Sequence, residues 1–514
     1  MRWIARALTS LVIVAWSLLL IAWLTLHWGI LPHIEQWRPQ IEAHASRALG
    51  VPVRIGNIQV RSGGWIPSVE LRDVVLQDRQ LRTALELPRV VAALSARSLL
   101  ALELRFEQLL IDGAHLEVRR DAQGRLFVAG LDFSGASGDS AAANWFFRQH
   151  EFVIRGGSLR WADEQRGAPA LALTDVQLVV RNGLRHHDMR LDATPPPEWG
   201  DRFSMRGRFT QPLLGDSGDW RRWSGVMYVD LPHADVSELR RHVDLPFALN
   251  QGDGSVRAWI DVQNGQAQGA TVDLALREVV LQLASTVEPL ALEQIEGRLA
   301  GQRSTDGFTL AVQQFGFITG DGVRWPRSDM RLGWRQREGQ PSGGGEFSAQ
   351  RLDLGLIAQV ATRVPIGDAV RKLLAELNPQ GIVSNLATRW DGALDAPSTY
   401  EIKGVLSGLS LAAKPSSEAN GIGRPGLRNA TLALSASEKG GEAQLGIANG
   451  SLELPGVFDD AVLPMDQLSA QLLWRVEPSK VAGAAPKLSV QVKDAKFANA
   501  DAQAQLRVSW ATGI

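Results

Sequence analysis

The chain contains two adjacent histidines followed by an aspartate, His186, His187 and Asp188, whose types could hold a metal ion. Imidazole nitrogens and carboxylate oxygens are common ligands of zinc. Neighbouring residues of an extended strand point to opposite faces, so these two imidazoles cannot easily reach one ion. Asn182-Gly183 precedes them and is a strong signal for a tight turn. We therefore interpret the group as the solvated end of a hairpin.

A second segment, Gly215-Asp216-Ser217-Gly218, has the letters that surround the nucleophilic serine of trypsin-like proteases. That chemistry needs a histidine base and an orienting carboxylate beside the serine. Here Asp219-Trp220 stands where a second glycine is expected, and no recognisable histidine loop precedes the segment. The segment is therefore interpreted as a turn between strands.

A third segment spells a dinucleotide fingerprint with Gly421, Gly423 and Gly426. A phosphate cradle requires a strand, a tight turn and then a helix N-terminus. Pro425 lies within the motif and the strand-like residues 427–434 follow it, so we interpret it as a loop. Carboxylates elsewhere are dispersed over polar strand faces. The sequence thus predicts no enzyme, no catalytic residue, no metal site and no cofactor.

Composition narrows the class of protein further. At 514 residues the chain is too long for a single core and is expected to contain two or more modules. Its net charge of −1 provides no electrostatic field for nucleic acid, so no nucleic-acid partner is predicted. The 50 glycines and 24 prolines are scattered, which is typical of many short strands joined by turns.

The N-terminus predicts a membrane anchor over residues 7–31, which contain no Asp, Glu, Lys or Arg. About 20 apolar residues suffice to cross a hydrocarbon core of roughly 30 Å. Arg2 and Arg6 lie on the short N-terminal side, so the positive-inside rule keeps residues 1–6 in the cytoplasm and exports the remainder. The alternative is a cleaved signal peptide, whose apolar core is shorter and ends at a small-residue site.

The remainder of the chain is predicted to be mainly β. A helix is expected over 34–49, ended by Gly50, and the pattern beyond residue 100 alternates with a period of two almost throughout. Asn264-Gly265 and Asn449-Gly450 predict hairpins. Short helices are expected at 235–243, 354–363 and 367–377. The predicted fold is one transmembrane helix followed by an elongated, curved antiparallel β-sheet groove with a few short helices.

One face of these alternating strands is apolar, and its function has two interpretations. It is either the core of an ordinary sandwich or barrel, or the lining of a groove for lipid. Each CH₂ group withdrawn from water gains about 0.8 kcal/mol, so an acyl chain crossing water needs continuous apolar cover. The candidate lining residues are Trp223, Met227, Val229, Leu231, Val256, Ala258, Ile260, Val262, Val272, Leu274, Leu276, Met330, Leu332 and Trp334.

These patterns predict an order of segments along the chain. Because the sequence stops at Ile514 in the middle of a strand pattern, we expect an N-terminal fragment of a longer protein. The predicted segments are a cytoplasmic N-terminus at 1–6, a transmembrane helix at 7–31, an N-terminal module at 32–131, a linker at 132–144 and a β-groove of repeating strand-plus-short-helix units at 145–514.

The N-terminal motifs support a family resemblance. Residues 28–42 (WGILPHIEQWRPQIE), 50–56 (GVPVRIG) and 64–76 (GWIPSVELRDVVL) resemble the start of AsmA-like proteins, and the long YhdP-type members are the most similar. The resemblance implies a bacterial inner-membrane anchor, a periplasmic β-groove directed toward the outer membrane, and movement of phospholipids along that groove.

The apolar face and the family resemblance are compatible with two functions. The first is a conduit that shields phospholipids between the inner and outer membranes, with phospholipids and the inner membrane as partners. The alternative is an envelope assembly factor or scaffold that contacts outer-membrane proteins through sheet edges. A groove predicts strand faces free of large charges, whereas a scaffold predicts a filled interior.

Overall fold

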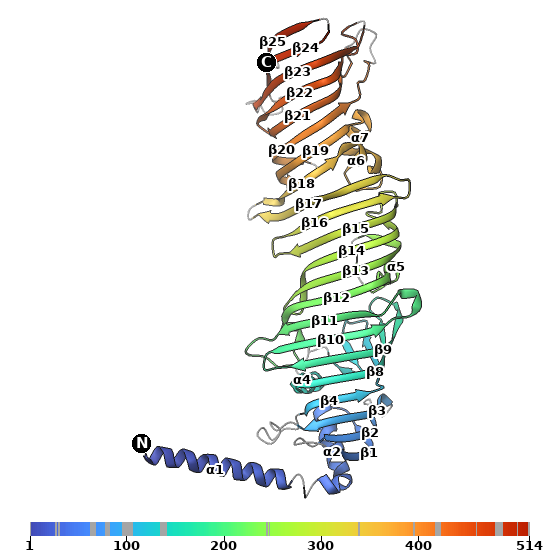
Figure 1. Ribbon diagram of the computed structural model, residues 1–514, viewed down its shortest axis with the longest axis vertical. Helices are drawn as coiled ribbons and strands as arrows, with labels where there is room; N and C mark the ends of the chain where they lie inside the picture. Colours follow the sequence, from blue (N-terminus) through green and yellow to red (C-terminus); the bar gives the residue numbers. More distant parts are fainter. Residues whose placement is uncertain are drawn as a thin grey trace. The chain divides into compact units, whose positions relative to one another are not determined.

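A computed structural model describes most of the chain (Figure 1). By contacts between Cα atoms it divides into two compact units: unit 1 comprises Met1–Asp244 and Ser255–Gln268, and unit 2 comprises Leu245–Gly254 and Gly269–Ile514. The described residues are 2–25, 28, 31–61, 68–77, 83–94, 106–133, 141–242, 245, 247–337, 340–393, 396–416, 423–458, 460–477, 487–500 and 502–511.

Both units are mainly β, as predicted. The strands of unit 1 are β1 (Val53–Arg61), β2 (Ser68–Gln77), β3 (Thr83–Leu94), β4 (Phe106–Asp112), β5 (His115–Arg120), β6 (Leu126–Val128), β7 (Leu131–Asp132), β8 (Glu151–Asp163), β9 (Ala168–Asn182), β10 (His186–Thr194), β11 (Phe203–Thr210) and β12 (Ser224–Asp235). Two further strands, β13 (Ala248–Gln263) and β14 (Gln266–Gln282), contribute residues to both units.

Unit 2 continues as an antiparallel meander in which each strand from β14 to β25 pairs with the next. Its strands are β15 (Leu290–Arg303), β16 (Gly307–Thr319), β17 (Arg324–Arg337), β18 (Gln340–Asp353), β19 (Gln380–Ala393), β20 (Ala396–Leu411), β21 (Gly426–Ser437), β22 (Gly440–Glu453), β23 (Val462–Glu477), β24 (Lys487–Ala498) and β25 (Gln503–Ala511).

Helices precede the strands or connect them. They are α1 (Arg2–Leu24), η2 (Leu31–Trp37), α2 (Arg38–Leu49), α4 (Ala141–Arg148), η3 (Pro197–Trp199), η4 (Trp220–Arg222), α5 (Val236–Leu239), α6 (Leu354–Val360) and α7 (Asp368–Leu377), where η marks a 3₁₀ helix. The helix expected over 7–31 is thus observed over Arg2–Leu24. Among the helices that the described residues form, none combines the length and the apolarity that crossing a membrane requires.

Local sequence explains where the later helices begin and end. Gly50 adopts a left-handed φ of 72° and closes α2 by donating its N–H to Ser46 O. The Asp235 carboxylate caps α5 by accepting the Ser237 N–H, and Asp353 caps α6 through the Leu356 N–H. The predicted helices at 235–243, 354–363 and 367–377 are therefore confirmed with shorter bounds, and the helix predicted at 34–49 is observed as η2 followed by α2.

The prediction of a purely antiparallel sheet is wrong in unit 1. Strand β8 pairs in parallel with β4 and with β5, which lie end to end along it, and antiparallel with β9 on its other side. The chain breaks between β4 and β5 at Gly113, whose φ is +72°. A side chain at Gly157 would lie 2.8 Å from Ala114 O, so glycine is required where the two backbones approach.

The predicted hairpin at Asn449-Gly450 is also wrong. Asn264 and Gly265 do form a two-residue turn, with φ of 50° and 66°. Asn449 instead lies inside β22 at a left-handed φ of 51°, where residues 448–450 face only Asn429 of β21. Other non-glycine residues take the same conformation within strands: Asp73, Asp175, Glu278, Gln314, Asn385, Asn429 and Asp494. Such bulges increase the local twist of a strand.

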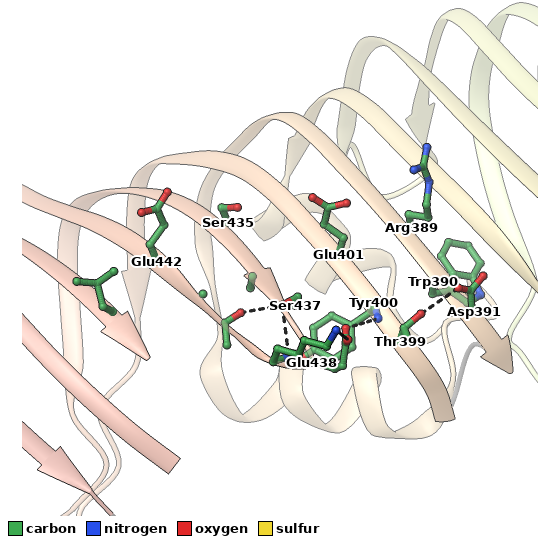
Figure 2. A pocket seen from close by; sticks show the side chains of 15 residues that line it. Arg389, Trp390, Asp391, Thr399, Tyr400, Glu401, Ser435, Ser437, Glu438 and Glu442 are labelled. Carbon is green, nitrogen blue, oxygen red and sulfur yellow. Dashed lines mark hydrogen bonds and ion pairs between the residues drawn. The ribbon is translucent and has the colours of Figure 1, made fainter. Parts of the chain in front are cut away.

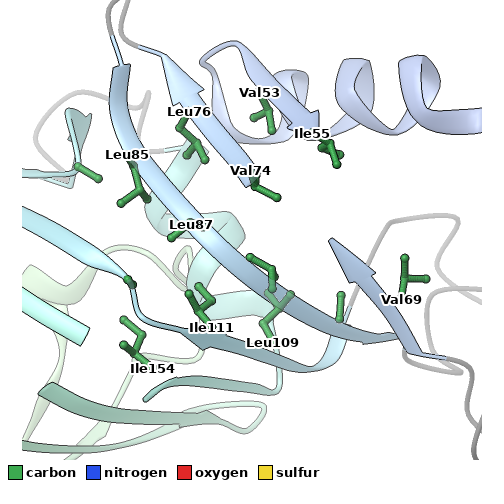
Figure 3. Packing of buried hydrophobic residues seen from close by; sticks show 14 of the residues in the cluster. Val53, Ile55, Val69, Val74, Leu76, Leu85, Leu87, Leu109, Ile111 and Ile154 are labelled. Atoms are coloured by element: carbon green, nitrogen blue, oxygen red, sulfur yellow. The ribbon is translucent and has the colours of Figure 1, made fainter. Parts of the chain in front are cut away.

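The principal core of unit 1 lies where β1–β4 and β8 face α2 and α4. Figure 3 shows Leu76, Leu85, Leu87 and Ile111 gathered from different strands into one cluster. Ile41 and Leu49 of the helices pack against this cluster from outside the sheet. The helices thus supply the second layer that an apolar sheet face needs.

The bulges yield a test of backbone conformation. Asn385 is exposed, has a φ of 52° and lies in β19. We expect Asn385→Val to lower the free energy of unfolding by about 1–2 kcal/mol, because a β-branched residue is strained in this region. Asn385→Gly should stay within about 0.5 kcal/mol of the wild type. Equal losses for the two variants, measured by urea denaturation of the full chain, would refute this assignment.

Candidate functional site

The strands β9–β12 have one apolar and one polar face. Residues directly opposite one another on neighbouring strands share a face. One cross-strand row contains Val180, Met189, Gly207 and Met227, and the next contains Leu178, Leu191, Met205 and Val229. The intervening row contains Val179, Arg190, Arg206 and Tyr228, so the polar side chains lie on the opposite face.

The apolar face of unit 1 lines a partly open cavity of about 740 Å³. Pockets for small molecules commonly have volumes of about 300–1,000 Å³. The lining is apolar apart from His44 and the indole nitrogens. Contributing side chains come from α2 (Ile41, Ala45, Leu49), from β1–β5 (such as Ile55, Leu87, Leu109 and Leu116), from α4 (Trp145, Phe146, Phe147), and from β8–β13 (such as Phe152, Val180, Met189, Phe209, Met227 and Val262).

Aromatic side chains from α4 form one wall of this cavity. Phe146 packs edge-on against Phe152 of β8, with ring centroids 4.5 Å apart. Phe147 contacts Trp223 in the same way at 4.8 Å. The indole nitrogen of Trp223 is buried and has no hydrogen-bond partner among the described residues. A carbonyl group of a bound molecule could accept this hydrogen bond.

A chain of buried polar groups fixes the end of α4. The Gln149 side chain accepts the Phe106 N–H at 2.9 Å and donates to Trp145 O at 2.6 Å. Asn182 in turn donates to Gln149 O at 2.8 Å. Its carboxamide oxygen lies 2.7 Å from His187 Nδ1. Satisfied buried polar groups of this kind hold a structure in one arrangement.

His187 is the residue that sequence reasoning placed incorrectly. His186 is exposed at the hairpin end, as expected, but His187 is 1% exposed and its ring stacks on Trp223 with centroids 3.9 Å apart. Its Nε2 lies 3.2 Å from Gln211 Oε1. Burial lowers the pKa of His187, and the hydrogen bond to Gln211 offsets part of this shift. The imidazole is therefore a structural part of the cavity wall.

The predicted groove residues of unit 1 are brought to one side of the sheet. Trp223, Met227 and Val262 line the cavity. Val229 and Leu231 follow Met227 at alternate positions of β12 and share its face, and Val256, Ala258 and Ile260 have the same relation to Val262 in β13. Contact of these residues with lipid stays a prediction.

The predicted residues of unit 2 belong to longer apolar rows. Val272 pairs with Leu299, which pairs with Val312, Met330 and Ala349 in succession. A neighbouring row contains Leu310, Leu332 and Phe347, and another contains Phe308, Trp334 and Gly345. On β14, Leu274 and Leu276 follow Val272 at every second position and therefore share its face.

Charged pairs occupy the opposite face of the same strands. In unit 2, Arg298 Nε lies 2.6 Å from Asp273 Oδ1 across β15 and β14. In unit 1, Arg208 Nε lies 2.9 Å from Asp188 Oδ1 across β11 and β10. The predicted division into an apolar inner face and a polar outer face is therefore confirmed for these strands.

The apolar face of unit 2 is not buried like a core. Leu310 is 47% exposed, Phe308 is 39% exposed and Tyr400 is 37% exposed. By contrast, Ala430 and Ile447 on the same side are nearly fully buried in a cluster that includes Leu354 of α6. Within the described residues, the face thus contains both buried and partly exposed regions.

The other motifs from the sequence lie away from this face or carry no site. Residues 215–218 form part of the β11–β12 loop, in which Gly218 donates its N–H to Asn144 Oδ1. Residues 421–422 of the glycine motif lie outside the described residues, and Gly426 begins β21. The described residues include no group of three His, Cys, Asp or Glu side chains placed to hold a metal ion.

Sequence reasoning missed α4 and the cavity that it closes. Residues 132–144 were predicted as a linker, and 134–140 of these lie outside the described residues. The signal that could have located the helix is the run Ala141–Arg148, AAANWFFR, which places three adjacent aromatic residues beside small helix formers. The proposed boundaries of the segments stay a prediction.

The fold and the site define a class: an open β-sheet protein with an apolar inner face, a charged outer face and a partly open apolar cavity in unit 1. Within that class, the chain belongs to the YhdP family, because the family model described as YhdP protein matches residues 1–512. This finding confirms the expected resemblance. No curated protein and no solved structure matches the chain.

The buried imidazole predicts a pH dependence of stability. Because the pKa of His187 is lowered in the folded state, unfolded chains bind more protons between that pKa and about 6.5. The contribution of His187 to the free energy of unfolding is therefore complete above about pH 6.5 and is lost as the pH falls toward the lowered pKa of the folded state. We expect His187→Phe to cost about 1–3 kcal/mol at high pH, because Asn182 loses its buried partner.

The cost of the His187→Phe variant should shrink on acidification, because only the wild type has this titration. Denaturant unfolding of both proteins from about pH 8 to about pH 5 measures the difference. A difference that stays constant over this range would show that His187 does not titrate with folding.

Proposed function

We propose that this protein shields phospholipid acyl chains and conducts them between the inner and outer membranes along its apolar face. The observation that carries the proposal is the half-exposed apolar row of unit 2, in which Leu310, Phe308 and Tyr400 of interior strands are 37–47% exposed. An exposed apolar surface of this kind marks a binding surface in a soluble region. Membership of the YhdP family supports the same conclusion.

The chemistry of the two faces fits a lipid better than a polar ligand. A phospholipid in water loses about 0.8 kcal/mol for each exposed CH₂ group, so the acyl chain needs cover along its whole path. The rows from Val272 to Ala349 and from Leu310 to Phe347 offer apolar side chains on successive strands. Neighbouring strands are about 4.8 Å apart, so the apolar side chains of successive strands lie side by side without a polar gap.

The cavity of unit 1 supports storage of an acyl chain there. Its volume of about 740 Å³ and its apolar lining suit a flexible hydrocarbon. The hydrogen bonds of Gln149 and Asn182 hold the end of α4 in place, and α4 forms one wall of the cavity. The unpartnered indole N–H of Trp223 can donate to an ester carbonyl of the same lipid.

Anchoring in the inner membrane, with the body in the periplasm, is part of the proposal. Its support is the uncharged stretch 7–31 and the two arginines before it, Arg2 and Arg6. Within α1, Leu11 and Trp16 are each 68% exposed. An apolar helix without a protein partner is stabilised when lipid surrounds it.

The alternative of an envelope scaffold has less support. A scaffold that binds other proteins through sheet edges needs no open apolar face, and its interior would be filled. The half-exposed row of unit 2 therefore favours the conduit. Outer-membrane or envelope proteins stay candidate partners at either end of such a conduit.

A charge on the inner face tests the proposal. We expect Leu310→Arg to reduce photo-cross-linking of strands β15–β18 by a phospholipid with a photoreactive acyl chain by about tenfold, which corresponds to 1.4 kcal/mol. The matched control is Gln302→Arg, because Gln302 is exposed and lies next to Gly301, the residue that pairs with Leu310, on the opposite face.

Cross-linked peptides are identified by mass spectrometry, and circular dichroism checks that both variants fold. Labelling of both variants at the wild-type level would exclude passage of the lipid over Leu310. Loss of labelling in both would mean that net charge, and not the inner face, determines binding.

A further inference from the structure

The two rims of the apolar face in unit 2 differ in composition. All strands from β14 to β25 alternate in direction, so the C-terminal ends of β17, β19, β23 and β25 lie at one rim. Near these ends the apolar face carries Trp334, Trp390, Trp474 and Trp510. The helices α6 and α7 connect β18 to β19 and lie at the opposite rim. We call these the tryptophan rim and the helix rim.

Four of the five tryptophans of unit 2 lie at the tryptophan rim, and the fifth has another role. Trp325 begins β17 near the helix rim, where it packs against the buried cluster of Ala349, Leu352 and Val383. Its indole N–H donates to Ser328 Oγ at 3.3 Å. The asymmetry between the rims therefore concerns the four tryptophans alone.

The rings at the tryptophan rim are held over glycines of neighbouring strands. A methyl group at Gly345 would lie 2.3 Å from a ring carbon of Trp390, and one at Gly441 would lie 2.5 Å from a ring carbon of Trp474. Trp334 similarly covers Gly343, and its ring stacks with Phe308 at 6.2 Å between centroids. The rings are thus fixed in position at the rim.

The tryptophan rim also adjoins polar and charged groups. Trp390 and Tyr400 line a pocket of about 590 Å³ at the strand ends together with Glu438 and with Arg389 and Glu401 of the outer face (Figure 2). At the same end of the strands, the Thr399 hydroxyl donates to Asp391 Oδ2 at 3.0 Å. An aromatic ring with an apolar body and a polar tip is most stable at such a boundary between water and hydrocarbon.

The helix rim carries aliphatic side chains on the inner face and no tryptophan of this kind. Leu406 and Leu409 pack in a cluster with Leu354 of α6. On α7, Val370 is 50% exposed and Leu373 is 54% exposed. The charged side chains near this rim form ion pairs with one another, such as Arg371 with Asp368. A hydrocarbon tail that lies on the inner face near this rim would therefore contact aliphatic side chains.

We infer that unit 2 orients its lipid across the strands, with the polar headgroup at the tryptophan rim and the acyl chains directed to the helix rim. The inference rests on the proposed lipid conduit and adds a fixed orientation to it. Tyr400 and Leu406 lie on one face of β20, six residues apart, which is roughly 20 Å at 3.3 Å per residue. One leaflet of a bilayer has a hydrocarbon thickness of about 15 Å, so the face is wide enough for an extended chain.

Single-cysteine variants test this orientation, because the chain has no cysteine of its own. Tyr400→Cys places a fluorophore at the tryptophan rim and Leu406→Cys places one near the helix rim. Lys403→Cys is the matched control, because Lys403 is exposed and lies midway between these positions in sequence but on the outer face. Leu386→Cys on β19 replaces Leu406→Cys if the latter fails to fold, since Leu386 is only half-buried.

The labelled 514-residue chains are loaded with phosphatidylcholine carrying a nitroxide quencher on the headgroup or near the end of an acyl chain. We expect the ratio of headgroup to chain-end quenching to exceed one for Tyr400→Cys and to fall below one for Leu406→Cys. Lys403→Cys should be quenched weakly by both lipids. Replacing Trp334, Trp390 and Trp474 by leucine should bring the ratio for Tyr400→Cys close to one.

The outcomes separate this inference from the proposed function. Equal ratios at both positions, or a reversed order, would overturn the orientation while lipid binding stands. An unchanged ratio in the triple leucine variant would overturn the role of the tryptophans. Absence of quenching at every inner position would overturn the conduit itself.

Discussion

The structure depends on one geometric constraint: successive side chains of a β-strand point to opposite faces. When apolar residues occupy alternate positions on many consecutive strands, the sheet acquires one apolar face that it cannot cover by itself. The row through Val272, Leu299, Val312 and Met330 is such a face. Something other than the strands must cover it, and the two units differ in what does so.

In unit 1 the cover comes from helices. α2 and α4 lie over the face, pack against a buried core and leave a partly open cavity of about 740 Å³ beside it. The position of α4 is fixed by groups that are unusual inside an apolar layer: Gln149, Asn182 and His187 satisfy one another's hydrogen bonds. Because these groups would be costly to bury without partners, they select one position of the helix. In unit 2, among the described elements, α6 covers one rim and the face beyond it is half exposed.

Alternation with a period of two was sufficient to predict the class of fold and the division into faces. Residues such as Met227 and Leu332 could be placed because each position in a strand fixes the side of the sheet to which its side chain points. Their partners could not be predicted, because register depends on residues distant in sequence. The parallel pairing of β8 with β4 is of this kind, since it joins segments about 43 residues apart.

The errors also have local physical causes. Asn449-Gly450 predicts a hairpin because asparagine tolerates a left-handed φ, and the structure uses the same property for a bulge inside β22. His187 was expected in solvent because histidine is polar. Its burial depends on Asn182 and Gln211, which no sequence pattern identifies as its partners. For Asn449 and His187, the sequence shows the conformational or polar property of the side chain, but the place where that property acts depends on tertiary contacts.

The central claim is that the apolar face binds phospholipid, and the most direct measurement is mass spectrometry of lipid that co-purifies with the 514-residue chain. After removal of detergent, the account predicts phospholipid bound in a fixed ratio to protein, which Leu310→Arg reduces and Gln302→Arg preserves. A folded chain that carries no phospholipid, and takes up none from liposomes, would contradict it.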